Sequence, residues 1–348
     1  MNEKTITMKD IARELNVSVA TVSRSLKNSK LISKDVREKI QKYAEEHNFT
    51  PNLLASNLRN SSKGQQLNII GVIIPQIAHY YFSTVLSGME EEASKHGYLI
   101  IAAQSDEMFE REVEICEAFR KTRVCGVIVS QAKDTVEHSH FQKLIDSNIP
   151  LVFYDRICTG LNTSRVVVDD YQGAFSAVEY LIKCGCKRIA FYRTPMKIEI
   201  TKNRYNGYRD ALLKHHLPVD PEIEIVCDNR ADAEDITPEI LSKDNRPDGF
   251  FAINDDTALG ILYSAKRMGF RIPTDIQICG FSNGIRAISC EPMLTTVEQR
   301  GTKIGREAVD VLIKHIKGET PKNKIDKRIV KTRLIIRGTT KRLPENSY

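Results

Sequence analysis

Short apolar segments alternate with amphipathic segments along most of the chain, and this alternation restricts the fold more than any other feature. Eight apolar segments of strand length lie between residues 67 and 281, among them "LNIIGVII" and "DGFFAI". Helical patterns such as "YQGAFSAVEYLIKCG" lie between them. Strands that are apolar on both faces and separated by helices form parallel sheets covered by helices. The pattern predicts an α/β core of two doubly wound parallel sheets, with a lobe boundary near 157–164 and a return crossing near 290.

Residues 8–48 carry a different pattern, with three short amphipathic helices instead of strands. Apolar residues recur at helical spacing in "MKDIARELN", "SVATVSRSLKN" and "SKDVREKIQKYAEEHN". Ser18 and Ser33 stand where N-caps of the second and third helices are expected. The turn "LNVS" between the first two helices is short enough for a helix-turn-helix packed against a third helix.

The positive charge of the chain is concentrated in this N-terminal part. Residues 1–63 contain 12 basic and 7 acidic residues, whereas the rest contains 39 and 38. This asymmetry indicates a polyanionic partner for the helical unit. The longest apolar runs are too short to cross a membrane, and the N-terminus lacks an apolar signal-peptide core. We therefore expect a cytoplasmic protein with no membrane partner, in which the eight dispersed cysteines are buried free thiols.

The second helix has the composition of a helix that recognises base pairs of double-stranded DNA. Val22 and Leu26 read as core, and the opposite face carries small and polar side chains. Arginine at such a position can pair with guanine, small apolar side chains can contact thymine methyl groups, and hydroxyls suit phosphates. A small helical dimerisation or adaptor unit is the alternative. The predicted DNA-contacting residues of this helix are Val19, Ala20, Thr21, Ser23 and Arg24.

The chain resembles the lac-repressor (LacI/GalR) family of bacterial transcription regulators. The likeness runs from "KDIARELNVSVATVSRSL" through "NFTPNLLASNLR" to core motifs such as "NRYNGYRDAL", "FFAINDDTALGIL" and "LTTVEQ". It implies a helix-turn-helix domain over 1–48, a hinge helix and linker over 49–65, and a two-lobed, periplasmic-binding-protein-like core over 66–340. In the family, positions matching Val19, Ala20 and Arg24 choose the operator bases, and Leu58 matches a leucine that wedges into the minor groove.

The resemblance also implies where DNA and a small effector bind. We expect the hinge segment to be frayed in the free protein and helical when two copies pair on DNA. Its predicted DNA contacts are Asn52, Ala55, Leu58 and Arg59. The effector is expected between the lobes, at the strand ends. The predicted effector-binding residues are His79, Tyr80, Tyr81, Phe82, Asp155, Arg156, Arg204, Asn254, Asp255, Ser282 and Gln299.

Aromatic faces combined with Asp, Asn and Arg suit a polyhydroxylated ligand. Tyr80, Tyr81 or Phe82 could instead belong to the core of a lobe, and Arg156 could form a surface salt bridge. One departure from the family concerns the ligand. Many sugar-responsive members have an aspartate after "GF", where this chain has Ser282 in "GFSNG". Together with His79, this predicts a different ligand or one that carries its own negative charge.

Three classes of protein fit these patterns to different degrees. A periplasmic-type solute-binding protein would share the core but not residues 1–60, and a sugar-acting enzyme would need a catalytic constellation. The phosphate-binding and nucleophile motifs of common enzyme families are missing from the sequence. The sequence therefore predicts a homodimeric, ligand-responsive regulator, most simply a repressor, that binds a pseudo-palindromic operator and requires no cofactor or metal.

Overall fold

The computed structural model describes residues 6–26, 28–47, 49, 67–321 and 324–344. The chain divides into two compact units, Met1–Leu67 and Asn68–Tyr348. The predicted hinge helix and the predicted DNA contacts of Asn52, Ala55, Leu58 and Arg59 lie outside the described residues.

The first unit contains the three expected helices. They are α1 (Met8–Glu14), α2 (Val19–Leu26) and α3 (Lys34–Glu46). Thr7 caps α1 in a capping box with Asp10, and the Ser18 hydroxyl accepts the Thr21 backbone N–H at 3.0 Å at the start of α2. Ser33 occupies the N-cap position of α3, but its side chain makes no capping hydrogen bond. The buried core of the unit consists of Ile11, Ala12, Val22, Ile40 and Ala44.

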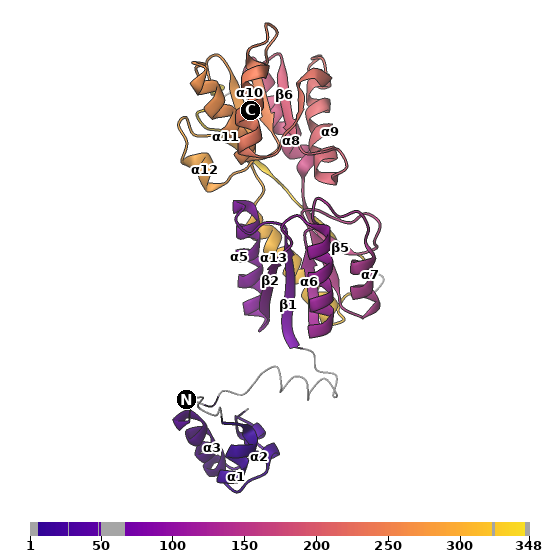
Figure 1. Ribbon diagram of the computed structural model, residues 1–348, viewed down its shortest axis with the longest axis vertical. Coiled ribbons are helices and arrows are strands. Elements are labelled where there is room, and N and C mark those ends of the chain that lie inside the picture. Colours follow the sequence, from indigo (N-terminus) through magenta and orange to yellow (C-terminus); the bar gives the residue numbers. More distant parts are fainter. Residues whose placement is uncertain (1–5, 27, 48, 50–66, 322–323, 345–348) are drawn as a thin grey trace. The chain divides into compact units, whose positions relative to one another are not determined.

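The second unit contains two lobes, each built on one six-stranded sheet (Figure 1). The sheet of lobe 1 has the order β11-β5-β4-β3-β1-β2. Its strands are β1 (Leu67–Ile74), β2 (Leu99–Gln104), β3 (Val124–Val129), β4 (Leu151–Tyr154), β5 (Ser164–Val168) and β11 (Lys327–Val330). Its helices are α5 (Tyr80–Lys95), α6 (Phe109–Thr122), α7 (Ser139–Asp146) and α13 (Gly301–Ile316).

The sheet of lobe 2 has the order β12-β10-β9-β8-β6-β7, and β12 alone runs antiparallel to its neighbour. Its strands are β6 (Ile189–Arg193), β7 (Glu224–Val226), β8 (Gly249–Ala252), β9 (Gln277–Ser282), β10 (Thr295–Glu298) and β12 (Arg333–Ile335). Its helices are α8 (Asp170–Lys183), α9 (Glu199–Lys214), α10 (Arg230–Leu241), α11 (Asp255–Arg267) and α12 (Ile285–Ile288). The two doubly wound sheets predicted from the alternation of strands and helices are confirmed.

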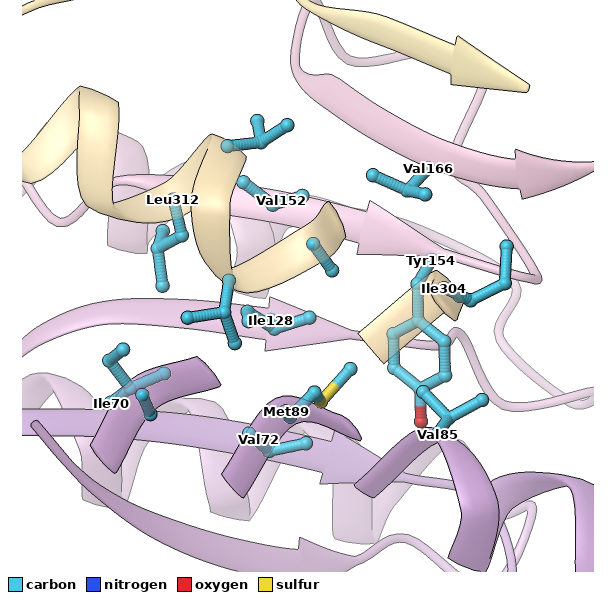
Figure 2. Close-up of a cluster of buried hydrophobic side chains, with 14 of the residues drawn as sticks. Ile70, Val72, Val85, Met89, Ile128, Val152, Tyr154, Val166, Ile304 and Leu312 are labelled. Carbon is cyan, nitrogen blue, oxygen red and sulfur yellow. The ribbon is translucent and has the colours of Figure 1, made fainter. Parts of the chain in front are cut away.

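Helix α13 belongs to lobe 1 although it follows most of lobe 2 in the sequence (Figure 1). Its residues Ile304 and Leu312 pack against strand residues such as Val152 and against Met89 of α5, as Figure 2 shows. The helices approach closely at glycines. A Cβ atom on Gly305 would lie 2.1 Å from the Val85 carbonyl oxygen, and one on Gly88 would lie 2.1 Å from that of Thr302. Only glycine fits such an approach without moving a backbone.

The predicted crossings between the lobes are wrong in position and incomplete. Strand β5 pairs with β4 and β11, so the first crossing falls at Asp169 and not near 157–164. Strand β10 pairs with β9 in lobe 2, so the return falls at 299–300 and not near 290. A third crossing at 331–332, which was not predicted, separates β11 in lobe 1 from β12 in lobe 2. Periodicity identifies a strand but not the sheet that it joins.

No helix in the part of the chain that the structure describes is long and apolar enough to span a membrane.

Candidate functional site

The outer face of α2 presents the side chains predicted to read DNA. Ala20 and Arg24 are exposed, Val19, Thr21 and Ser23 are half-buried, and Val22 is fully buried beneath them. Arg24 forms no ion pair with any residue in the described ranges, so its guanidinium is available to a partner. The hydroxyl of Thr21 lies 2.9 Å from that of Ser18, which fixes it at the helix start.

A polar cavity of about 550 Å³ lies between the two lobes. Side chains from the carboxyl ends of several strands line it, as expected for open parallel sheets. The structure brings nine of the predicted effector residues together around this cavity. They are His79, Tyr81, Phe82, Asp155, Arg156, Arg204, Asn254, Ser282 and Gln299.

Tyr80 and Asp255 lie elsewhere, against an adjoining cavity of about 370 Å³ that shares His79 and Ser282 with the first. Tyr80 is exposed at the start of α5, and helical geometry turns it away from its neighbour Tyr81. Asp255 is buried behind the wall, where its carboxylate accepts hydrogen bonds from the Thr296 hydroxyl and the Gly284 backbone N–H. Tyr81 and Phe82 line the main cavity and also pack in the core of lobe 1.

Asp155 stands in the left-handed region, with a φ of 56°, directly after β4. Burial raises the pKa of its carboxyl group, and the guanidinium groups of Arg156 and Arg204 act in the opposite direction. Arg156 donates to the Glu107 carboxylate at 2.6 Å, and its guanidinium carbon lies 5.7 Å from the centre of the Phe82 ring. Arg156 is therefore held at the cavity wall by residues of lobe 1.

Arg204 of α9 is 5% exposed and is held in place by residues of lobe 2. Its Nε donates to Asp170 at 2.8 Å, its Nη1 donates to the Ile253 carbonyl oxygen, and its guanidinium stacks 3.6 Å from the Phe281 ring centre. Asp170 directly follows the first crossing and was not predicted as a site residue. Its neighbour Asp169 caps α8 and accepts a hydrogen bond from the Gln172 backbone N–H.

Several charged side chains of the cavity were missed. Lys133 of lobe 1 and Asp228 of lobe 2 form an ion pair across the lobes, and the Asp228 carbonyl oxygen accepts from the Asn254 side chain at 2.7 Å. Both residues lie a few positions after a strand, as the predicted residues do, and that spacing is the signal that could have identified them. Within the described ranges, no group of three His, Cys, Asp or Glu residues could hold a metal ion.

Two buried carboxyl groups predict a pH dependence of stability. Burial raises the pKa of Asp170 and of Asp255 from the ordinary value of 3.8 to about 6. Each group binds its proton more tightly in the folded state, so its contribution to stability is fully present below about pH 4 and is lost as the pH rises through 6. We expect Asp255→Asn to reduce the fall in the free energy of unfolding over this range by about 3 kcal/mol. Urea denaturation of the full chain at a series of pH values measures the free energy of unfolding and its change with pH.

The exposed Asp146 on α7 provides the control, because Asp146→Asn should leave this pH profile unchanged. A profile that Asp255→Asn does not alter either would contradict the burial of an ionisable group beside Thr296.

Both parts of the chain match known protein families. Residues 7–52 match bacterial regulatory proteins of the lacI family, and residues 178–340 match a periplasmic binding protein-like domain. The ribose operon repressor of Halalkalibacterium halodurans is 32% identical over 338 residues, which cover 96% of this chain and 97% of that protein. The HTH-type transcriptional repressor CytR of Escherichia coli strain K12 is 32% identical over 345 residues, 98% of each protein.

Solved structures agree on the fold. The lac repressor dimer bound to operator and the anti-inducer ONPF has a TM-score of 0.84, with 22% identity over 97% of this chain and 99% of that one. A LacI family transcriptional regulator from Enterococcus faecium with bound ribose has a TM-score of 0.69, with 25% identity over 79% of this chain and 100% of that one.

Proposed function

Because the chain belongs to the lacI family of bacterial regulatory proteins, we propose that it represses transcription by binding an operator through α2 and releases or retains that operator according to a small molecule bound between its lobes. The observation that carries the proposal is the full-length likeness to two named repressors, combined with a cavity at the strand ends of both lobes. No reaction is assigned to the chain.

The ligand is proposed to be a sugar or a sugar derivative. The cavity combines the aromatic side chains of Tyr81 and Phe82 with the polar groups of Asp155, Asn254 and Gln299. Rings with several hydroxyl groups are bound by such paired donors and acceptors beside an apolar surface. The ribose bound to the Enterococcus faecium regulator supports the same class.

Two copies of the chain are proposed to act together on a pseudo-palindromic operator. The edge strand β2 of lobe 1 leaves Leu99 63% and Ile101 48% exposed. An apolar edge strand is a liability in a monomer and is suited to a subunit interface. The dimeric lac repressor supports this assembly. Such a dimer would act in the cytoplasm, where the operator DNA is.

A binding assay on operator-length duplexes tests the function. We expect fluorescence anisotropy to show sequence-specific binding by the full chain, with a midpoint shifted by one or more sugars or sugar derivatives. Binding that is equal on all duplexes and indifferent to every ligand would reject the proposal and favour a solute-binding role.

Arg24→Ala is expected to lose about 1–3 kcal/mol of discrimination at one operator base pair, because an arginine paired with guanine accounts for that much. The measurement is the affinity for a set of single-base operator variants. Arg13→Ala is a matched control, because Arg13 is an exposed arginine on α1 that pairs with Asp10. Both variants should weaken the salt-dependent part of the affinity for DNA, but only Arg24→Ala should change the preference between operator bases. An unchanged preference would reject the assignment of Arg24.

A further inference from the structure

We propose that the effector is an uncharged polyhydroxylated molecule and that the cavity discriminates against phosphorylated and carboxylated forms of it. This inference rests on the proposed function and adds the charge of the ligand to it. It decides between the two alternatives that the sequence leaves open at Ser282, because the pairing of charges around the cavity disfavours an anionic ligand.

Every cationic side chain on the cavity wall is already paired with a carboxylate of the protein. Arg156 pairs with Glu107 at 2.6 Å, and Arg204 pairs with Asp170 at 2.8 Å. Arg230 and Arg286, at the more exposed part of the wall, also have carboxylate partners. The remaining pairs are Arg230–Glu234 at 2.6 Å, Arg286–Asp256 at 2.8 Å and Lys133–Asp228.

One carboxylate remains without such a partner. Asp155 lines the cavity and is 8% exposed, and no cation among the described residues approaches it within ion-pair distance. The charges therefore balance except for one buried acidic group. A carboxylate in this position accepts hydrogen bonds, and a sugar hydroxyl can donate them without adding charge.

Two polar atoms near Asp155 complete the argument for hydroxyl groups. The His79 Nδ1 is buried and has no hydrogen-bond partner in the part of the chain that the structure describes, and the buried Tyr81 hydroxyl lies beside the Asp155 carboxylate and lowers its pKa. Burial lowers the pKa of His79, so its imidazole is neutral at pH 7 and offers one donor and one acceptor. A phenol, a neutral imidazole and a carboxylate together match the donors and acceptors of neighbouring ring hydroxyls.

An anionic group would have to compete with a carboxylate of the protein for its cation. If a phosphate or carboxylate of the ligand bonded to the guanidinium of Arg156, it would share that cation with Glu107 and place a second negative charge beside the Glu107 carboxylate. Like charges held together in a desolvated site repel each other strongly. We therefore expect phosphorylated or carboxylated sugars to bind about 100-fold more weakly than the uncharged sugar of the same ring.

The experiment compares matched ligands on the full chain. Isothermal titration would use D-ribose with ribose 5-phosphate, D-glucose with glucose 6-phosphate and glucuronate, and adenosine with its 5′-monophosphate. The same compounds are then tested for their effect on operator binding. The expected result is that at least one uncharged member binds and shifts operator affinity, while its anionic counterparts bind about 100-fold more weakly.

Glu107→Gln provides a second measurement, because it frees Arg156 from its carboxylate while keeping the shape of the side chain. In this variant we expect the ratio between the dissociation constants of the anionic and the uncharged ligand to fall by about tenfold. Glu110→Gln removes the same charge from an exposed position on α6 and should leave the preference unchanged. If Glu107→Gln does not fold, the comparison of matched ligands on the unaltered chain still decides.

An anionic member that binds as tightly as its uncharged counterpart, or more tightly, would overturn the inference while leaving the regulator function intact. Failure of every uncharged member to bind would overturn it as well. If the anionic ligands also did not bind, and no ligand of the set changed operator affinity, the cavity would lose its role in the proposed function.

Discussion

Replacing Arg204 by alanine is expected to abolish the effector response and also to lower the free energy of unfolding by about 3–5 kcal/mol. The guanidinium is buried against Phe281 and bonds to Asp170 and to the Ile253 carbonyl oxygen. Its removal leaves the Asp170 carboxyl group buried without its cation. The sequence alone predicts only the loss of ligand binding, because it does not reveal that Arg204 also holds lobe 2 together.

The two effects can be separated with a second substitution. Arg204→Ala combined with Asp170→Asn should recover most of the stability, because no buried charge is left unpaired, but should not recover the effector response. Urea denaturation and ligand-dependent operator binding measure the two properties on the same preparations. If Arg204→Ala alone still gave the full effector response, the effector site would be misplaced. If the double variant lost as much stability as Arg204→Ala, the unpaired Asp170 carboxylate would not be the cause of that loss.

The second large effect is expected at the contact between α5 and α13. Gly305→Val should lower the free energy of unfolding by at least about 3 kcal/mol, because the added side chain would meet backbone and not a movable side-chain end. The atom that a Cβ would approach is the Val85 carbonyl oxygen, 2.1 Å away. Near-ultraviolet circular dichroism during urea denaturation measures the loss of packing in the core.

Gly160→Val is the control for this prediction. Gly160 is exposed, and the nearest atom to a Cβ there is the His138 Nδ1 at 3.8 Å, an ordinary contact. Its substitution should change stability by less than about 0.5 kcal/mol. Equal stability of both variants would contradict the close approach of the helices.

Most of the fold could be predicted because the signals for it are local. The apolar strands, the amphipathic helices and the short turn between α1 and α2 each depend on a few adjacent residues. The strand with which another strand pairs does not depend on adjacent residues alone. Val166 and Val167 of β5 lie beside a loop that reads as a linker, and only their pairing with β4 and β11 places them in lobe 1.

The site shows the same division between local and distant information. A polar residue just after an apolar strand is visible in the sequence, so Asp155 and Asn254 could be placed at the cavity. The direction of one side chain within a helical turn cannot be seen in the sequence. For this reason Tyr80 and Asp255 were assigned to the main cavity, although they line a neighbouring one. The position of Lys133 and Asp228 after a strand is visible in the sequence, but their pairing over 95 positions is not.

The three crossings between the lobes have a consequence for synthesis on the ribosome. The core of lobe 1 needs Ile304 and Leu312 of α13, which follow β1 by more than 200 residues. At about 5–20 residues per second, the first strands wait roughly 10–50 s for that helix. The helical unit, whose core lies within the first 49 residues, can fold long before. A nascent chain would thus carry its DNA-reading helix well ahead of the lobes that control it, and regulation would begin only after release of the finished chain.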